Sequence, residues 1–173
     1  GVGSGGVSEP EYLEDLDNFG AWLRTQPEVK HVASFADIVK RINRSMNGDR
    51  QNFYAVPENR ELSAQYLLLY EMSLPYGLDL NDQLNVDKSE SRLLVTLTNV
   101  STTQMKDLRS RAIGWLRENT PEAMHVQPSG QAVMFAYIGE RNFKAMTRGT
   151  LLAFILISAC LMLALRSLRL GLI

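Results

Sequence analysis

The feature that most constrains this chain is a run of seventeen consecutive residues without a charge, from Gly149 to Leu165. A helix of that length spans about 25 Å, slightly less than the ~30 Å hydrocarbon core of a bilayer. The apolar residues lie on all sides of such a helix, so no polar face remains for water. A helix buried in a protein core would have a similar sequence. We interpret the run as a membrane-spanning helix attached to a water-facing domain.

Basic residues flank the run on both sides. Arg148 precedes it, and Arg166 and Arg169 follow it. Long cationic side chains can extend to the lipid head groups and compensate for a short apolar run. Because positive charges occur on both sides, charge alone does not decide which end faces the cytoplasm.

Composition excludes several classes of protein. A net charge of −1 over 173 residues gives no reason to expect a nucleic-acid partner. The single cysteine, Cys160, lies inside the apolar run, so the rest of the chain has no disulfide framework and no thiolate metal site. Residues 1–6 lack the pattern of a signal peptide, and no strand precedes their glycines as a dinucleotide-binding loop requires. We interpret residues 1–6 as a flexible linker.

An internal duplication organises the water-facing part. The segment Trp22–Val32 resembles Trp115–Val126, since both contain Trp-Leu-Arg, then a Pro-Glu pair and a His-Val pair. Apolar residues at helical spacing precede each tryptophan, and a proline ends each predicted helix. A short strand is then predicted at Val29–Val32 and, by the same reasoning, at Ala123–Val126.

Other segments complete the predicted fold. Residues Ser91–Val100 are typical of a strand, which makes the second copy a strand–helix–strand unit. Ser34 and Asp37 form a predicted capping box for a helix that ends at Asn47-Gly48. Further helices are predicted at Glu61–Met72 and Gln131–Met146. We therefore expect an α+β, ferredoxin-like (split βαβ) domain that lacks its first strand, with inserted helices.

Side chains typical of catalysis or metal binding are scarce. The two histidines, His31 and His125, occupy equivalent places in the duplicated units, which favours a shared structural role near a strand over metal binding. No Gly-x-Ser-x-Gly motif marks a nucleophile. Carboxylate pairs such as Asp15 and Asp17 are typical of solvated charges on a helix. We expect neither an enzyme nor a cofactor.

Three segments resemble a known family. Their residues are Trp22 to Asp37, then Gln65 to Gly77 (QYLLLYEMSLPYG), and finally Leu165 to Ile173 (LRSLRLGLI). Together they resemble the periplasmic loop in the second half of resistance-nodulation-division (RND) transporters, followed by the next transmembrane helix. The similarity is to the lipid and hopanoid exporters related to the mycobacterial membrane protein large (MMPL) group. The resemblance covers about residues 7–173.

The resemblance implies a proton-driven efflux system for lipid transport in the bacterial inner membrane, with porter domains in the periplasm. It divides the chain into a linker (1–6), a periplasmic porter domain (7–139), a helix entering and spanning the membrane (140–166), and a cytoplasmic turn that begins a truncated segment (167–173). It implies as partners the lipid bilayer, the remaining segments of the parent transporter and a hydrophobic or lipid-like cargo, with a homo-oligomer also among the candidates. The proton-relay residues of the family lie in helices that this sequence does not contain.

One apolar helix is the candidate cargo surface. Residues Tyr66, Leu69, Tyr70 and Met72 lie on the helix predicted at Glu61–Met72, with Met46 and Phe53 as further candidates. Large, soft apolar side chains can line a path for an acyl chain or a ring-shaped lipid. The alternative is that they pack on the sheet or on a neighbouring subdomain. For the whole chain, the alternative function is a single-pass, membrane-anchored periplasmic binding or scaffold domain.

Overall fold

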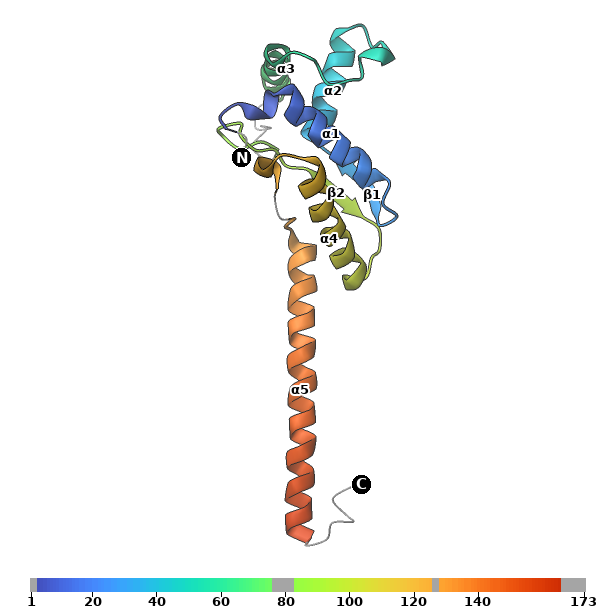
Figure 1. The fold of residues 1–173 in the computed structure, drawn as a ribbon, viewed down its shortest axis with the longest axis vertical. Helices are drawn as coiled ribbons and strands as arrows, with labels where there is room; N and C mark the ends of the chain where they lie inside the picture. Colours follow the sequence, from blue (N-terminus) through green and yellow to red (C-terminus); the bar gives the residue numbers. More distant parts are fainter. Residues whose placement is uncertain (1–2, 76–82, 126–127, 166–173) are drawn as a thin grey trace. The chain divides into compact units, whose positions relative to one another are not determined.

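The chain divides into two compact units. The computed structural model describes residues 3–75, 83–125 and 128–165, except for the side chains of 131–133, 135–141, 144 and 162–165. Unit 1 is Gly1–Pro128 and unit 2 is Ser129–Ile173. The elements of both units are drawn in Figure 1.

Unit 1 is built mainly from helices. Its α-helices are α1 (Pro10–Arg24), α2 (Phe35–Met46), α3 (Arg60–Ser73) and α4 (Thr102–Asn119). Its short 3-10 helices are η1 (Gly6–Ser8), η2 (Gln51–Phe53) and η3 (Glu122–Met124). The predicted helices are confirmed within one or two residues at their ends, as expected for boundaries that depend on local sequence.

Local hydrogen bonds explain where these helices begin. The Ser34 hydroxyl accepts a hydrogen bond from the Asp37 amide, and the Asp37 carboxylate accepts one from the Ser34 amide, so the predicted capping box is present. The same arrangement joins Ser101 and Gln104 at the start of α4. Each box satisfies amides that would otherwise have no partner in the first turn. At the end of α2, Gly48 has a φ of 70°, a conformation that costs glycine little.

The sheet of unit 1 has two antiparallel strands among the described residues. Strand β1 (Val29–Ala33) pairs with β2 (Leu94–Leu97), with Ala33 opposite Leu94 and Val29 opposite Leu97. The register shifts between Val29 and His31. A pair of strands is stable only when a helix or further strands cover one face, and α1 packs on β1 and on α4. The predicted α+β class is therefore confirmed.

One predicted strand is wrong. Residues Ala123–Val126 were expected to form a strand, but the structure has η3 at Glu122–Met124. The amides of Met124 and His125 donate to the carbonyls of Pro121 and Glu122, so the turn satisfies its own backbone groups. It also buries the Met124 side chain in the core. Val126 lies outside the described residues.

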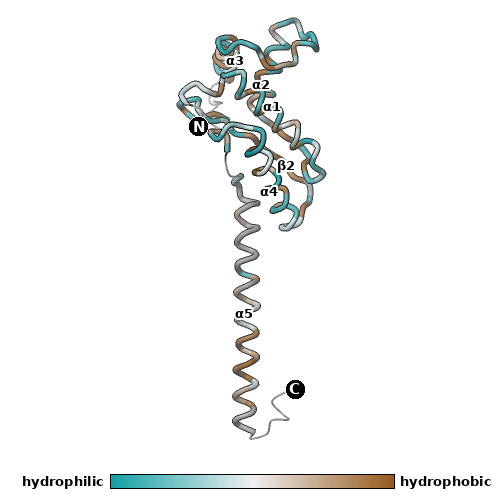
Figure 2. The backbone as a smooth tube through the Cα atoms, in the orientation of Figure 1, coloured by the Kyte–Doolittle hydropathy of each residue, from teal (hydrophilic) through white to brown (hydrophobic). Residues whose placement is uncertain are grey.

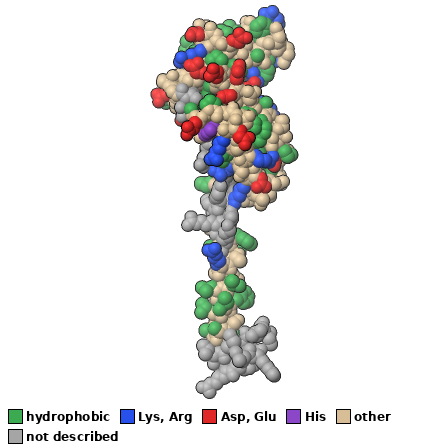
Figure 3. All heavy atoms as spheres, viewed as in Figure 1, with side chains coloured by type: hydrophobic (Ala, Val, Ile, Leu, Met, Phe, Trp, Pro, Cys, Tyr) green, Lys and Arg blue, Asp and Glu red, His purple; other side chains and the backbone are tan. Residues whose placement is uncertain are grey.

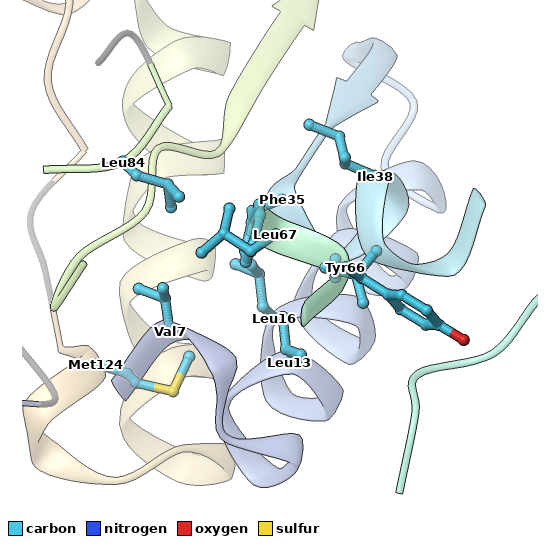
Figure 4. Packing of buried hydrophobic residues seen from close by; sticks show 11 residues of the cluster. Val7, Leu13, Leu16, Phe35, Ile38, Tyr66, Leu67, Leu84 and Met124 are labelled. Carbon is cyan, nitrogen blue, oxygen red and sulfur yellow. The ribbon is translucent and has the colours of Figure 1, made fainter. Parts of the chain in front are cut away.

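The core of unit 1 lies between α1, α2 and α3. Its members are buried apolar residues from both ends of the unit, nine of which Figure 4 labels: Val7, Leu13, Leu16, Phe35, Ile38, Tyr66, Leu67, Leu84 and Met124. Burying one such side chain completely contributes roughly 1.5–3 kcal/mol. Val7 is fully buried, and the Gly5 amide donates to the Asp87 carbonyl at 3.0 Å, so the segment before α1 is joined to the loop before β2.

The two duplicated segments both form a helix, but they differ in the structure that follows the helix. Leu23 of α1 and Leu116 of α4 are both buried, as the repeat predicts. The preceding tryptophans, Trp22 and Trp115, stack on each other with 5.9 Å between ring centroids. Phe19 stacks on both rings. The chain after the proline is a strand in the first copy and η3 in the second.

Unit 2 contains one long helix, α5 (Gln131–Leu165), of 35 residues. Figure 2 shows hydrophobic residues along its second half, and Figure 3 shows hydrophobic side chains on its surface. In the part of the chain that the structure describes, no helix combines the length and the apolar content needed to cross a membrane. Arg148 is exposed on α5, whereas the predicted flanking residues Arg166 and Arg169 lie outside the described residues.

Candidate functional site on helix α3

Helix α3 has one face in the core and another at the surface. Ser63, Tyr66 and Leu67 are buried. On the other face, Leu68, Leu69 and Met72 are 55%, 44% and 77% exposed. Because residues three and four positions apart are neighbours on a helix, these three side chains form one patch, which we call the α3 patch.

The structure separates the four predicted cargo residues. Tyr66 belongs to the core, where its hydroxyl donates to Asn43 Oδ1 at 3.2 Å. Tyr70 is half-buried and packs against the same core. Only Leu69 and Met72 are exposed, and the sequence analysis missed Leu68. The spacing of Leu68 and Met72, four residues apart, is the signal that could have identified it.

The two further candidates lie in other elements. Met46 is 59% exposed at the end of α2. Phe53 belongs to η2, and the Arg50 guanidinium lies over its ring, 4.6 Å from the centroid. Neither residue belongs to the α3 patch. The α3 patch itself offers apolar contact and no group for acid–base or nucleophilic chemistry.

A second candidate site was not found from the sequence. A cavity of about 460 Å³ lies against the end of α1, strand β1 and the first half of α2. We call it the basic cavity, because three cations and one carboxylate line it. Its lining includes the charged residues Arg24, Asp37, Lys40 and Arg41, and also His31, Ser34, Tyr54 and Gln83. Most of the lining comes from residues 31–41, and the fold adds Arg24, Tyr54 and Gln83 to it.

Ion pairs order part of the basic cavity. The Arg24 Nη2 donates to Asp37 Oδ2 at 2.7 Å and to the Val32 carbonyl at 3.2 Å. The Lys40 ammonium lies 2.5 Å from Asp17 Oδ1 and 3.8 Å from Asp37 Oδ1. It also lies 4.9 Å from the centroid of the Tyr54 ring, within the range of a cation–π interaction.

The histidines do not share the structural role that the repeat predicts. His31 is an exposed residue of β1 beside the basic cavity. His125 follows η3, and its Nε2 lies 2.9 Å from the Thr120 carbonyl. Within the described residues, no three His, Cys, Asp or Glu side chains are close enough together to hold a metal ion.

Two titratable groups of α1 are shifted by their surroundings. Burial raises the pKa of Tyr12, and a 2.7 Å hydrogen bond with the Ser91 hydroxyl partly opposes that effect. Partial burial also raises the pKa of Asp15, and the nearby carboxylates of Glu11 and Glu14 add to the shift. Neither group lines the basic cavity.

Comparison of the chain with protein-family models, with curated proteins and with solved structures found no match. The geometry of the two sites therefore carries the functional argument, together with the resemblance in the sequence.

Proposed function

We propose that this chain is a periplasmic porter segment of a proton-driven RND-type exporter of lipid-like or amphiphilic molecules in the bacterial inner membrane. The resemblance of QYLLLYEMSLPYG and LRSLRLGLI to that family suggests this function. The structural observation that supports it best is the exposed apolar surface of α5, because a helix with such a surface needs an apolar environment.

The membrane-spanning role of α5 is part of this proposal. The exposed large apolar side chains of α5 range from 44% (Leu161) to 67% (Phe143) exposed. A contiguous apolar surface on a helix is unstable in water and stable in lipid. The uncharged run continues in the sequence to Leu165, beyond the last described side chain, with Arg148 before it and Arg166 and Arg169 after it.

The ferredoxin-like architecture is a further part of the proposal. In a split βαβ fold, the first helix is followed by a strand that pairs antiparallel with the strand before the second helix. The order α1, β1, β2 and α4 has this arrangement, with α2 and α3 inserted between the strands. We propose that the first strand of such a fold would pair with the edge of β2 that has no partner strand among the described residues.

The α3 patch is the proposed contact for cargo. Leu68, Leu69 and Met72 offer flexible apolar side chains, which suit an acyl chain or a fused-ring lipid. The alternative function, a membrane-anchored binding domain, remains supported by the basic cavity, which could bind a ligand without any transport.

Labelling of the only cysteine tests the membrane role. Cys160 lies in the uncharged run and is exposed on α5. In liposomes that contain the full chain, a water-soluble maleimide should leave Cys160 unlabelled until detergent is added, because lipid surrounds the thiol. A matched control carries Cys160→Ser and Ser129→Cys, and its thiol should react before detergent is added. Equal labelling of the two proteins in liposomes would contradict a membrane-spanning α5.

An export assay tests the porter role. In cells that produce the parent transporter, Leu69→Ser combined with Met72→Ser should lower export of an amphiphile several-fold, without changing the amount of protein. The control is Val86→Ser, which alters an exposed apolar residue outside α3 (89% exposed) and should leave export unchanged. Normal export by the double variant would remove the α3 patch from the cargo path. Normal export after deletion of unit 1 would favour the binding-domain alternative.

A further inference from the structure

The basic cavity is not used by the proposed export function. We propose that it is a binding site for an organic phosphate. This inference concerns unit 1 alone and does not depend on whether the chain belongs to a transporter. Four observations support it: the unused donors of Arg41, the unused donors of Arg24, the local balance of charge, and the size of the cavity.

Arg41 offers a guanidinium without a carboxylate partner. Its Nε donates to the Asp37 backbone carbonyl at 3.3 Å, and its side chain lines the cavity. In the described part of the chain, no carboxylate lies within ion-pair distance of Arg41, and neither Nη atom has a hydrogen-bond partner. Two adjacent donors of a guanidinium match the spacing of two phosphate oxygens.

Arg24 offers a second set of donors. Both of its hydrogen bonds, to Asp37 and to the Val32 carbonyl, come from Nη2. Among the described residues, Nε and Nη1 have no hydrogen-bond partner. The two bonds from Nη2 hold the guanidinium in place, which reduces the entropy lost when a ligand binds.

Among the described residues, the charges around the cavity leave an excess of one cation. In the part of the chain that the structure describes, two carboxylates pair with the lining cations: Asp37 with Arg24 and Lys40, and Asp17 with Lys40. The third lining cation is Arg41. Arg44 is nearby, over the Tyr54 ring, but it pairs with Asp49 at 3.7 Å. The described residues therefore give the cavity a net positive charge, which would attract an anion.

Geometry and size select the class of anion. A guanidinium can bind a carboxylate or a phosphate through two parallel hydrogen bonds, but a phosphate has three acceptor oxygens and up to two negative charges, so it suits two guanidiniums better than a carboxylate does. A cavity of about 460 Å³ is in the range that holds a small organic molecule and is large for an isolated ion. The phosphate could belong to a soluble phosphate ester or to a phospholipid head group, since the recognised chemistry is the same.

Calorimetric titration of the full chain in a neutral maltoside detergent tests the proposal. The probes are inorganic phosphate, glycerol 3-phosphate and dihexanoyl phosphatidic acid, with sodium chloride at matched ionic strength as the control for screening. We expect saturable binding of the phosphates and none of chloride. Arg41→Gln should weaken binding at least tenfold, because it removes the guanidinium whose donors are free.

Arg50→Gln is the matched control variant. Arg50 is also exposed, and its Nε also donates to a backbone carbonyl, that of Asn47 at 2.9 Å, but it does not line the cavity. This variant should bind phosphates as the unchanged protein does. Absence of saturable binding, or equal losses in Arg41→Gln and Arg50→Gln, would overturn the proposal. Tighter binding of dihexanoyl phosphatidic acid than of glycerol 3-phosphate would identify a lipid head group as the source, and equal binding would identify a soluble ester.

Discussion

The ammonium group of Lys40 lies 2.5 Å from the carboxylate of Asp17, so this ion pair joins α2 to α1. Lys40 is a buried residue, with a side chain only 10% exposed, whereas the Asp17 side chain is 29% exposed. Removing one partner of a buried ion pair destabilises a protein more than replacing both partners by apolar residues, because the remaining charge stays desolvated. This asymmetry leads to the first prediction.

Asp17→Asn should lower the free energy of unfolding by about 1–3 kcal/mol, because the buried Lys40 loses a charged hydrogen-bond partner. Lys40→Met combined with Asp17→Leu should recover most of that loss, because it removes the buried ammonium together with its partner, while Asp37 keeps its ion pair with Arg24. Urea unfolding followed by tryptophan fluorescence measures both effects, since both tryptophans lie in unit 1. A double variant as unstable as Asp17→Asn alone would contradict this account of the pair.

The stacked rings of Phe19 and Trp115 provide the second prediction. Their centroids are 5.3 Å apart, and they join α1 to α4. A double-mutant cycle with Phe19→Leu and Trp115→Leu should give a coupling energy of about 0.5–1.5 kcal/mol in urea unfolding. The control cycle pairs Trp115→Leu with Phe53→Leu. The Phe53 ring lies under the Arg50 guanidinium, so the effects of these two substitutions on the free energy of unfolding should be additive. Additivity in both cycles would mean that the rings touch without stabilising the helix pair.

The helices were predictable from the sequence because their signals are local. Ser34 and Asp37 are three residues apart, and the capping box that they form depends on nothing distant. The direction of the sheet was not predictable in this way, since Val32 pairs with Val95 across more than sixty residues of chain.

The duplication correctly predicted that Leu23 and Leu116 are buried. It wrongly predicted a strand where the structure has η3. Similar residues after Pro121 suggested a second strand, but the burial of Met124 in the core decides the local conformation. The basic cavity could not be predicted, because charged residues such as Arg24 and Lys40 are individually typical of a solvated helix surface. Only the fold brings them together.

The hydroxyl group of Tyr66 provides the third prediction, which separates core residues from surface residues on α3. Tyr66→Phe should lower the free energy of unfolding by about 0.5–1.5 kcal/mol, because Asn43 loses a hydrogen bond in the core. Tyr70→Phe is the matched control, since the Tyr70 hydroxyl has no hydrogen-bond partner in the described part of the chain. Both changes are measured by urea unfolding. Equal stabilities of the two variants would show that the Tyr66–Asn43 bond contributes nothing.

The raised pKa of Asp15 provides the last prediction, a pH dependence of stability. Burial and the carboxylates of Glu11 and Glu14 raise this pKa above its ordinary value of 3.8 in the folded protein. Between the two values, the folded chain binds more protons at Asp15 than the unfolded chain does, so this group makes the free energy of unfolding fall as the pH rises. At a pH above the raised pKa, the charged Asp15 side chain lowers the free energy of unfolding by its full amount. At a pH below the ordinary pKa, this destabilisation is absent.

Asp15→Asn should therefore raise the melting temperature at pH 7, because a neutral amide avoids both the desolvation and the repulsion. The gain should shrink as the pH falls through the raised pKa and approach zero near about pH 3, where Asp15 is mostly protonated in both states. Thermal unfolding between pH 3 and pH 7, followed by tryptophan fluorescence, measures the difference. Glu118→Gln, at an exposed position of α4, is the control and should give no such crossover. A gain for Asp15→Asn that persists unchanged at pH 3 would show that packing, and not the charge of Asp15, is responsible.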